Sequence, residues 1–479
     1  MIVGRKKEIH LIKATMEDDK SHFIAVYGRR RVGKTFLIRE ACGYRFTFQH
    51  AGLYDGNMKE QLFAFKSSLK EAGADTKKIP ANWAEAFEKL KDLIRESMEK
   101  KKIIFIDELS WMDTPKSDLM RALENFWNGW ASARKDIVLI ICASATAWIL
   151  SKVIHNKGGL YHRLTEQIHL EQFCLADCEE YVRSSNIAFS RDQILQYYMI
   201  FGGVPFYWSL LRRGESVVQN TDRILFAKDA PLKDEFNYLY ASVFRNPHVY
   251  LQIIRALAKK KQGMTREDII TDTGIPNSGA LTAKLEELEN CGFIRKYTAF
   301  GQKKKNAIYQ ITDQFTLFYY QFLEDNPTDE LFWSNQINTP RVNAWMGLAF
   351  EKVCMAHLQQ IKYRLGISGV LTDVNAWSCK SNPDRGLFGS QIDMLIVRKD
   401  QVINLCEVKY SQAEYTLTSK ETENIRRRIH DFQTATGTHF AIYPTLITTH
   451  GMVANAYSGE IQSVIVMDDL FVSIMNKLI

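Results

Sequence analysis

Residues 28–35 combine glycine, lysine and threonine at the spacing of a loop that wraps around phosphate groups, G-x-x-x-x-G-K-T. The glycines let the backbone N–H groups turn inward towards phosphate oxygens. The lysine would reach the β- and γ-phosphates, and the threonine hydroxyl would bind Mg²⁺. The residues predicted to bind the nucleotide are Gly28, Arg29, Arg30, Arg31, Val32, Gly33, Lys34, Thr35 and Phe36, with Thr35 also a metal ligand.

A pair of carboxylates, Asp107 and Glu108, follows the apolar run 103–106. Such a run is typical of a strand buried on both faces of a parallel sheet, and ligands bind at the carboxyl ends of these strands. We expect Asp107 to hold Mg²⁺ through Thr35 or a water molecule, and Glu108 to orient and polarise an attacking water. Together with the loop, this pattern predicts hydrolysis of ATP with Mg²⁺.

Two further polar residues could belong to the same site. Ser144 follows the apolar run 137–142, beside the strand that carries Asp107, and its hydroxyl could contact the γ-phosphate or the attacking water, or cap the next helix. Arg163 could reach the nucleotide of a neighbouring subunit in a homo-oligomer as an arginine finger, or be an ordinary surface arginine.

A second group with catalytic potential lies near the C-terminus. The runs 392–397 and 402–410 read as two strands of a hairpin whose tip is near Asp400, so Asp393 falls opposite Glu407. Directly opposed residues have Cβ atoms about 4.5–5.5 Å apart. Two carboxylates at that distance suit one Mg²⁺, so Asp393 and Glu407 are predicted metal ligands and catalytic residues.

Two more side chains could complete this group. Lys409 projects from the same face as Glu407, where it could position water or stabilise a pentavalent phosphate. Glu351, in the helix expected over 345–360, could add a carboxylate or be a solvated helix residue. These residues fit metal-dependent phosphodiester cleavage, and the alternative is that Asp393, Glu407 and Lys409 form a surface ion-pair cluster.

The elements that position these residues fall into successive segments. Strand and helix signals alternate at the start, as a parallel α/β sheet requires, and helical signals broken by the run 202–205 follow. The fold class is therefore α/β, a P-loop sheet with added domains. The predicted segments are 1–170 (P-loop ATPase core), 171–247 (helical lid), 248–322 (winged helix), 323–340 (polar linker) and 341–479 (α/β nuclease-like domain).

The segment 248–312 reads as a winged helix, with its second helix capped by Thr265 and ended by Gly274. It holds 11 Lys and Arg against six Asp and Glu, and a basic tip at 303–305. Its third helix, 278–291, is acidic, and phosphates would repel it. If the segment meets DNA, the basic wing leads and little sequence is read. The alternative is a docking module for protein.

Bulk properties are those of an ordinary soluble protein. The chain has 479 residues, 46% hydrophobic and 24% charged, which allows about three domains. A net charge of +7 is compatible with nucleic acid. The eight cysteines form no C-x-x-C pair and read as reduced core thiols. No signal peptide is visible, and the apolar run 137–150 is too short for a bilayer, so we expect a cytoplasmic protein without a membrane partner.

Together these motifs resemble a family of P-loop ATPases common in archaea and related to AAA-like and STAND ATPases. Many members carry a winged helix and then a PD-(D/E)XK nuclease-like domain. The resemblance implies an adenine contact at Val3, Gly4 and Arg5, Mg-ATP at Lys34, Thr35 and Asp107, and a sensor role for Ser144. The matching pieces are Val3–Arg5, Gly28–Thr35, Ile106–Leu109, Ser144–Thr146, Leu160–Leu164, Gly202–Pro205, Gly389–Asp393 and Cys406–Lys409.

The sequence therefore predicts an ATPase whose nucleotide state gates a DNA-directed, metal-dependent nuclease, with a possible role in defence against foreign DNA. The main alternative is a STAND-type switch whose inactive nuclease fold binds DNA or protein. A third is an ATPase that remodels a protein partner.

Overall fold

The computed structural model describes residues 2–155, 158–244, 246–302 and 306–474. The basic tip 303–305 lies outside them. The chain forms two compact units. The first holds residues 1–172, 204–206 and 237–247, and the second holds 173–203, 207–236 and 248–479.

The first unit contains a five-stranded parallel sheet. Its strands are β1 (His22–Tyr27), β2 (Phe48–Ala51), β3 (Lys102–Asp107), β4 (Ile137–Ala143) and β5 (Glu166–His169). They are ordered β2-β3-β4-β1-β5. All seven residues of β4 are buried, as expected for an apolar run covered on both faces. The neighbouring strands β1, β4 and β3 are parallel, so their carboxyl ends lie at the same edge of the sheet. The loop 28–33, Asp107 and Ser144 therefore all lie at that edge.

Helices cover both faces of this sheet. They are α1 (Lys6–Glu17), α2 (Lys34–Ala41), α3 (Met58–Glu71), α4 (Trp83–Glu96), α5 (Leu109–Met112), α6 (Leu119–Gly129) and α7 (Thr146–Ile149). Neighbouring strand residues point to opposite faces. Ile24 and Val26 therefore pack with α1 and α2, whereas Phe23 and Ala25 pack with α3, α4 and α6.

The segment expected to be helical is helical. It contains α8 (Leu175–Ser184), α9 (Arg191–Phe201), α10 (Pro205–Trp208), α11 (Val217–Thr221) and α12 (Glu235–Val243). Gly202 ends α9 with a φ of 62°. A Cβ on Gly203 would lie 1.8 Å from the carbonyl oxygen of Phe173, so only glycine fits there. The break at 202–205 is therefore set by backbone geometry.

Residues 248–311, here called the three-helix module, form helices and a small sheet. The elements are α13 (Pro247–Lys259), β6 (Met264–Thr265), α14 (Arg266–Thr273), α15 (Gly279–Asn290), β7 (Ile294–Tyr297) and β8 (Ile308–Ile311). The antiparallel sheet has the order β6-β8-β7. The predicted cap is confirmed, because Thr265 and Asp268 form a capping box, and Gly274 ends α14 with a φ of 70°.

The segment 323–340 is packed rather than a free linker. After α16 (Gln314–Phe318), the helix α17 (Phe332–Gln336) lies inside it. Trp333 is 1% exposed and packs edge-on against Phe318, Phe322 and Trp345. Its backbone N–H donates to Asp222 at 2.8 Å. Burial of the Trp333 ring stabilises the packed position of this segment, although most of its residues are polar.

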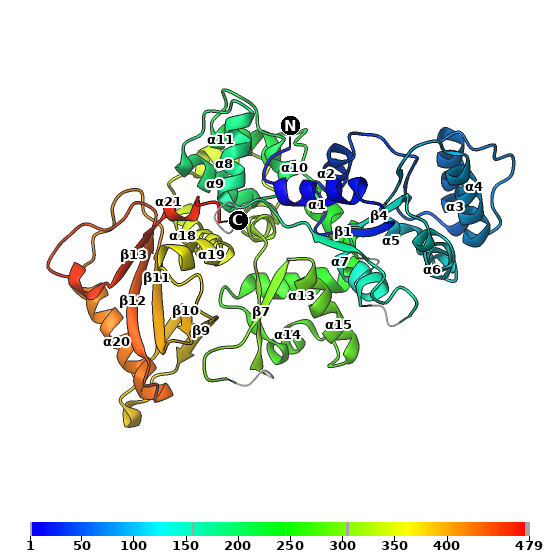
Figure 1. Ribbon diagram of the computed structural model, residues 1–479. Helices are drawn as coiled ribbons and strands as arrows, with labels where there is room; N and C mark the ends of the chain where they lie inside the picture. The colour runs from blue at the N-terminus through cyan, green and yellow to red at the C-terminus, as the bar shows by residue number, and fades with distance from the viewer. Residues whose placement is uncertain (1, 156–157, 245, 303–305, 475–479) are drawn as a thin grey trace. The chain divides into compact units, whose positions relative to one another are not determined.

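The C-terminal sheet domain, residues 340–474, is a mixed sheet between helices. Its elements are α18 (Pro340–Ala356), α19 (Leu358–Arg364), β9 (Thr372–Cys379), β10 (Ser390–Arg398), β11 (Val402–Lys409), α20 (Ser419–Thr436), β12 (Ala441–Thr448), β13 (Ser463–Val466) and α21 (Met467–Leu470). The order is β13-β12-β11-β10-β9, parallel from β11 to β13 and antiparallel elsewhere. Ile403 and Leu405 pack against Phe432 of α20, while Cys406 faces Cys354 of α18. The two helices thus lie on opposite faces, as Figure 1 shows.

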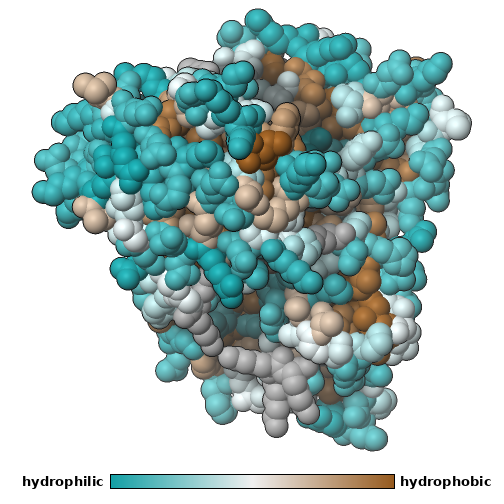
Figure 2. All heavy atoms as spheres, turned by 90° about the vertical axis from the view of Figure 1, so that its right-hand side faces the viewer, coloured by the Kyte–Doolittle hydropathy of each residue, from teal (hydrophilic) through white to brown (hydrophobic). Residues whose placement is uncertain are grey.

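Hydrophilic side chains dominate the face of the molecule turned to the viewer in Figure 2, and apolar ones there form small separate groups. In the described part of the chain, no helix combines the length and apolar character needed to cross a bilayer. All eight cysteines are free thiols.

Candidate functional site

The phosphate-binding loop connects β1 to α2 through two glycines that no other residue could replace without strain. Gly28 has a φ of 144°, and a Cβ there would lie 2.3 Å from the carbonyl oxygen of Leu170. Gly33 has a φ of 91° and precedes the first turn of α2. Arg31 also adopts a left-handed conformation, with a φ of 69°. The two glycines of the motif thus occupy the positions at which the backbone adopts a positive φ.

Lys34 is 5% exposed and lies across this loop. Its ammonium donates to the carbonyl oxygens of Gly28 and Arg29 at 2.9 and 3.0 Å, and to the hydroxyl of Ser144 at 3.0 Å. The lysine charge is therefore held at the mouth of the loop, where phosphate oxygens could replace the carbonyl oxygens as acceptors.

Thr35 and Asp107 come together as the sequence predicts. The Thr35 hydroxyl donates to Asp107 Oδ2 at 2.6 Å, and Asp107 is 8% exposed. The other oxygen of Asp107 accepts the backbone N–H of Glu108 at 3.0 Å. A hydroxyl and a carboxylate at this distance are oxygen ligands of the type that Mg²⁺ prefers.

Ser144 connects the lysine to the second acidic residue. Its hydroxyl donates to Glu108 Oε1, and its backbone N–H donates to Glu108 Oε2 at 3.0 Å. Ser144 does not cap the following helix, because Ala145 is the N-cap of α7 and no side chain caps it. The side chains of Lys34, Ser144 and Glu108 thus form one hydrogen-bonded chain at the sheet edge.

The outer residues of the site are less closely tied to the loop. Arg5 donates to the carbonyl oxygen of Glu171 at 2.6 Å, and Val3 is buried. Phe36 is 44% exposed, and Arg163 is exposed. The arginine-finger and adenine-contact roles therefore stay predictions.

Phe206 is a neighbour of the loop that the sequence analysis missed. The Arg31 guanidinium lies 4.2 Å from the centre of the Phe206 ring, and the Phe206 N–H donates to the Arg31 carbonyl oxygen at 3.4 Å. The sequence feature that could have pointed to Phe206 is the run 202–205, Gly-Gly-Val-Pro, directly before it. This run ends α9, and the next residue contacts the phosphate-binding loop.

The hairpin in the C-terminal sheet domain has the predicted register. Pairing runs from Met394 opposite Cys406 to Val397 opposite Ile403. Asp393 and Glu407 would be the next pair, but the ladder ends at Met394 and Cys406. A register shift between Ile392 and Leu395 interrupts the pairing of β10 with β9 at this point.

The grouping of Asp393, Glu407 and Lys409 in one site stays a prediction. Glu407 and Lys409 share a face, and their side chains form an ion pair at 2.9 Å. Asp393 lines a cavity of about 530 Å³ together with Glu351 and Lys409. Glu407 lines a cavity of about 50 Å³, with Lys409 and Arg428. Lys409 therefore borders both cavities, and burial together with the charges of Asp393 and Glu407 raises the pKa of the Glu351 carboxyl.

Arg428 of α20 is a second residue that the sequence analysis missed. It forms an ion pair with Glu407 Oε2, so both carboxylate oxygens of Glu407 have cationic partners. Within the described ranges, no group of three or more His, Cys, Asp or Glu could hold a metal ion. The metal-ligand role of Asp393 and Glu407 stays a prediction.

Glu351 is half-buried and faces the larger cavity rather than solvent. Burial raises the pKa of its carboxyl, and the charge of Asp393 raises it further. The solvated-helix alternative for Glu351 is therefore wrong, and the two carboxylates interact.

The parallel sheet, the glycine loop and the paired acids at the edge of the sheet define a P-loop ATPase domain. Residues 2–209 match the family model of an ATPase domain found predominantly in Archaea. The N-terminal part of the chain therefore has the fold and the motifs of a P-loop ATPase domain and is similar to that family.

The chain is also similar to proteins over longer stretches. An uncharacterized protein of Methanocaldococcus jannaschii is 23% identical over 436 residues, covering 90% of this chain and 91% of that protein. A Walker-type ATPase of Pyrococcus abyssi covers 66% of this chain and 95% of its own at 18% identity, with a TM-score of 0.48. The ORC2 protein of Aeropyrum pernix, with ADPNP and ADP, covers 74% and 96% at 12% identity, with a TM-score of 0.42.

Proposed function

We propose that this protein hydrolyses Mg-ATP and that its nucleotide state controls a DNA-cutting C-terminal domain, in a role such as defence against foreign DNA. One observation carries the nuclease part of the proposal. Two carboxylates and a lysine, Glu351, Asp393 and Lys409, line a single cavity at the point where β10 and β11 stop pairing.

In the ATPase site, each residue has a distinct part. Lys34 would bind the β- and γ-phosphates, and Thr35 with Asp107 would hold Mg²⁺, which supplies charge neutralisation when bound. Glu108 would take the proton of the attacking water as its oxygen bonds to the γ-phosphorus and the bond to the bridging oxygen breaks. Ser144 keeps the Glu108 carboxylate pointed at this position.

Two features support a DNA-directed C-terminal half. The element order of the three-helix module is that of a winged helix, and the segment 248–312 carries 11 basic against six acidic residues. In the sheet domain, Lys409 would stabilise the charge that develops on a phosphodiester under attack.

Cleavage of supercoiled plasmid and linear DNA tests this proposal. The purified full chain is incubated with Mg²⁺ or Mn²⁺, with and without ATP, beside Asp393→Ala and Lys34→Ala. We expect metal-dependent cutting that Asp393→Ala abolishes and that responds to ATP only when Lys34 is present. Asp373→Ala is the matched control, because this exposed aspartate of β9 pairs with Lys399. Absence of cutting in every condition, with ATP hydrolysis intact, would rule out the nuclease.

A second candidate function is a nucleotide-dependent switch whose C-terminal domain binds without cutting. The ion pairs of Glu407 with Lys409 and Arg428 favour it, because they occupy the carboxylate that a metal would need. In that case the Asp393→Ala chain would bind DNA or protein as the unmodified chain does, and neither would cut.

A further inference from the structure

The 530 Å³ cavity is built from two parts of the second unit, the three-helix module and the C-terminal sheet domain. Its volume is that of a site for a small ligand. One wall comes from β7, β8 and the turn before β6, and the other comes from α18, β9, β10 and β11. Each wall contributes a cation, which is buried on one side and half-buried on the other.

Lys352 of α18 is the cation on the sheet-domain side. It is 4% exposed and lines the cavity. Among the described residues, no hydrogen bond or ion pair of its ammonium is found at bonding distance. Burial disfavours the charged form of this side chain, whereas the nearby charges of Glu351 and Asp393 favour it.

Arg295 of β7 is the cation on the module side. Its Nε and Nη2 donate to Gln310 Oε1 at 2.9 and 2.7 Å, and its guanidinium lies 4.5 Å from the centre of the Tyr297 ring. The Gln310 amide is in turn held by the carbonyl oxygen of Lys261 at 2.6 Å. The guanidinium is therefore fixed in place by neutral groups, and its charge remains available to an anion.

The two cations act on each other across the cavity. Burial lowers the pKa of Lys352, and the nearby charge of Arg295 lowers it further. The acidic residues on the walls are Glu351, Asp393 and Asp268. Asp268 is occupied by the capping box of α14 and by Lys260. Glu351 and Asp393 therefore remain to compensate the cationic side chains of the lining, which are Lys261, Arg295, Lys352 and Lys409.

The two walls are joined by direct bonds. The Phe300 N–H donates to the carbonyl oxygen of Ala376 at 3.0 Å, and the Phe300 ring lies 5.1 Å from Phe432 in the core of the sheet domain. Gln262 of the module donates to Gln391 of β10. The cavity is therefore preformed, with its cations at fixed positions.

We propose that this cavity binds the phosphate of a nucleotide, supplied either as a free nucleotide or as the phosphorylated end of a nucleic-acid strand. Arg295 and Lys352 would share the phosphate oxygens between them. Tyr297 and Trp377 line the same cavity. The proposal does not rest on DNA cutting, since binding alone would relieve the repulsion between the two cations.

Calorimetric titration of the full chain tests it. Lys34→Ala is present throughout, so that the ATPase site does not contribute. The probes are inorganic phosphate, deoxythymidine monophosphate, and two single-stranded oligonucleotides of six nucleotides. One oligonucleotide carries a 5′-phosphate and the other a 5′-hydroxyl. We expect saturable binding of a phosphorylated probe, weakened at least tenfold by Lys352→Met and by Arg295→Met. Tighter binding of the mononucleotide identifies a free nucleotide as the ligand, and tighter binding of the 5′-phosphate oligonucleotide identifies a strand end.

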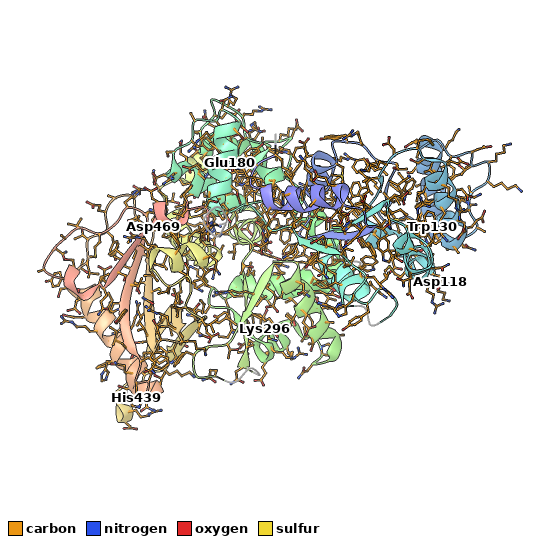
Figure 3. The ribbon with its side chains drawn as sticks, viewed as in Figure 1. Asp118, Trp130, Glu180, Lys296, His439 and Asp469 are labelled. Carbon is orange, nitrogen blue, oxygen red and sulfur yellow. The ribbon has the colours of Figure 1, made fainter. Side chains whose placement is uncertain are left out.

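The matched control is Lys296→Met. This lysine, labelled in Figure 3, is the exposed neighbour of Arg295 on β7 and does not line the cavity. It should leave the affinity unchanged. Circular dichroism of each variant confirms that it is folded. No binding by any probe, or binding that Lys352→Met, Arg295→Met and Lys296→Met change equally, overturns the proposal.

Discussion

At the residue scale, the hydroxyl of Ser144 is the contact that joins the two halves of the ATPase site. It accepts from Lys34 and donates to Glu108, and no other described hydrogen bond connects those two side chains. We therefore expect Ser144 to act by holding these two side chains in position.

We predict that Ser144→Ala lowers the turnover number for ATP by about 10- to 100-fold and leaves KM within about threefold. The Glu108 carboxylate would lose its orientation, while the loop that binds the phosphates would keep its shape. Steady-state kinetics would show this split. Ser144→Thr retains the hydroxyl and should restore most of the rate, whereas equal losses in both variants would indicate that the hydroxyl has no such role.

Gly28 gives a second prediction at this scale, which concerns stability. A methyl group at this position would lie 2.3 Å from a backbone oxygen, and backbone cannot give way as a flexible side chain can. We expect Gly28→Ala to lower the free energy of unfolding of the first unit by about 1–3 kcal/mol. Thermal unfolding measures the loss. Gly459→Ala is the control, because nothing lies within 4 Å of its Cβ position.

Some of these residues could be predicted from sequence and others could not. The phosphate loop is local, so glycine spacing and one flanking strand define it. Arg295 and Lys352 are far apart in sequence and come together only in the tertiary structure, and neither belongs to a motif. Phe206 was missed for the same reason.

At the element scale, the register of the hairpin of β10 and β11 could be predicted from the sequence, but its irregularity could not. Its register follows from the turn near Asp400, so the pairing of Met394 with Cys406 was predictable. The register shift between Ile392 and Leu395 could not be predicted. The run after Asp393 is apolar at every position, so the sequence does not show which side chains point to which face of the sheet. The packed segment around Trp333 was likewise hidden by its polar flanks.

His357 connects two helices, and it can do so only as a neutral ring. Its Nδ1 donates to the carbonyl oxygen of Val353 at 2.8 Å, and its Nε2 accepts the N–H of Leu175 at the start of α8 at 3.0 Å. Protonation of Nε2 would place its N–H against the N–H of Leu175, and this hydrogen bond would be lost. Burial accordingly lowers the pKa of His357 from 6.5 to about 4.

A pH dependence of stability follows from this lowered pKa. The unfolded chain takes up a proton near pH 6.5, whereas the folded chain does so only near pH 4. Stability is therefore full above pH 6.5 and falls as the pH drops from 6.5 to 4, by on the order of 3 kcal/mol. We expect the melting temperature of His357→Gln to change less over this window. His10→Gln, at an exposed histidine, should behave as the unmodified chain does. His50, whose pKa burial also lowers to about 4, accounts for a remaining slope.

At the scale of the whole molecule, residues 204–206 are a short insertion of the second unit's sequence into the unit that holds the phosphate loop. They belong to the first unit, while the stretches on both sides of them, 173–203 and 207–236, belong to the second. We therefore expect a change in the phosphate loop that moves Phe206 to reach α9, which ends at Phe201, along the chain.

We predict that Phe206→Ala uncouples nucleotide binding from the second unit. In the unmodified chain, a non-hydrolysable ATP analogue should slow amide hydrogen exchange in α9, because nucleotide on the loop fixes Arg31 and its ring partner. In Phe206→Ala this slowing should disappear, although the affinity for the analogue changes by less than about threefold, since Phe206 is not one of the residues predicted to hold phosphate. Phe63→Ala, at an exposed phenylalanine of α3, should respond as the unmodified chain does. Equal protection of α9 in all three proteins would show that the nucleotide signal does not pass through this contact.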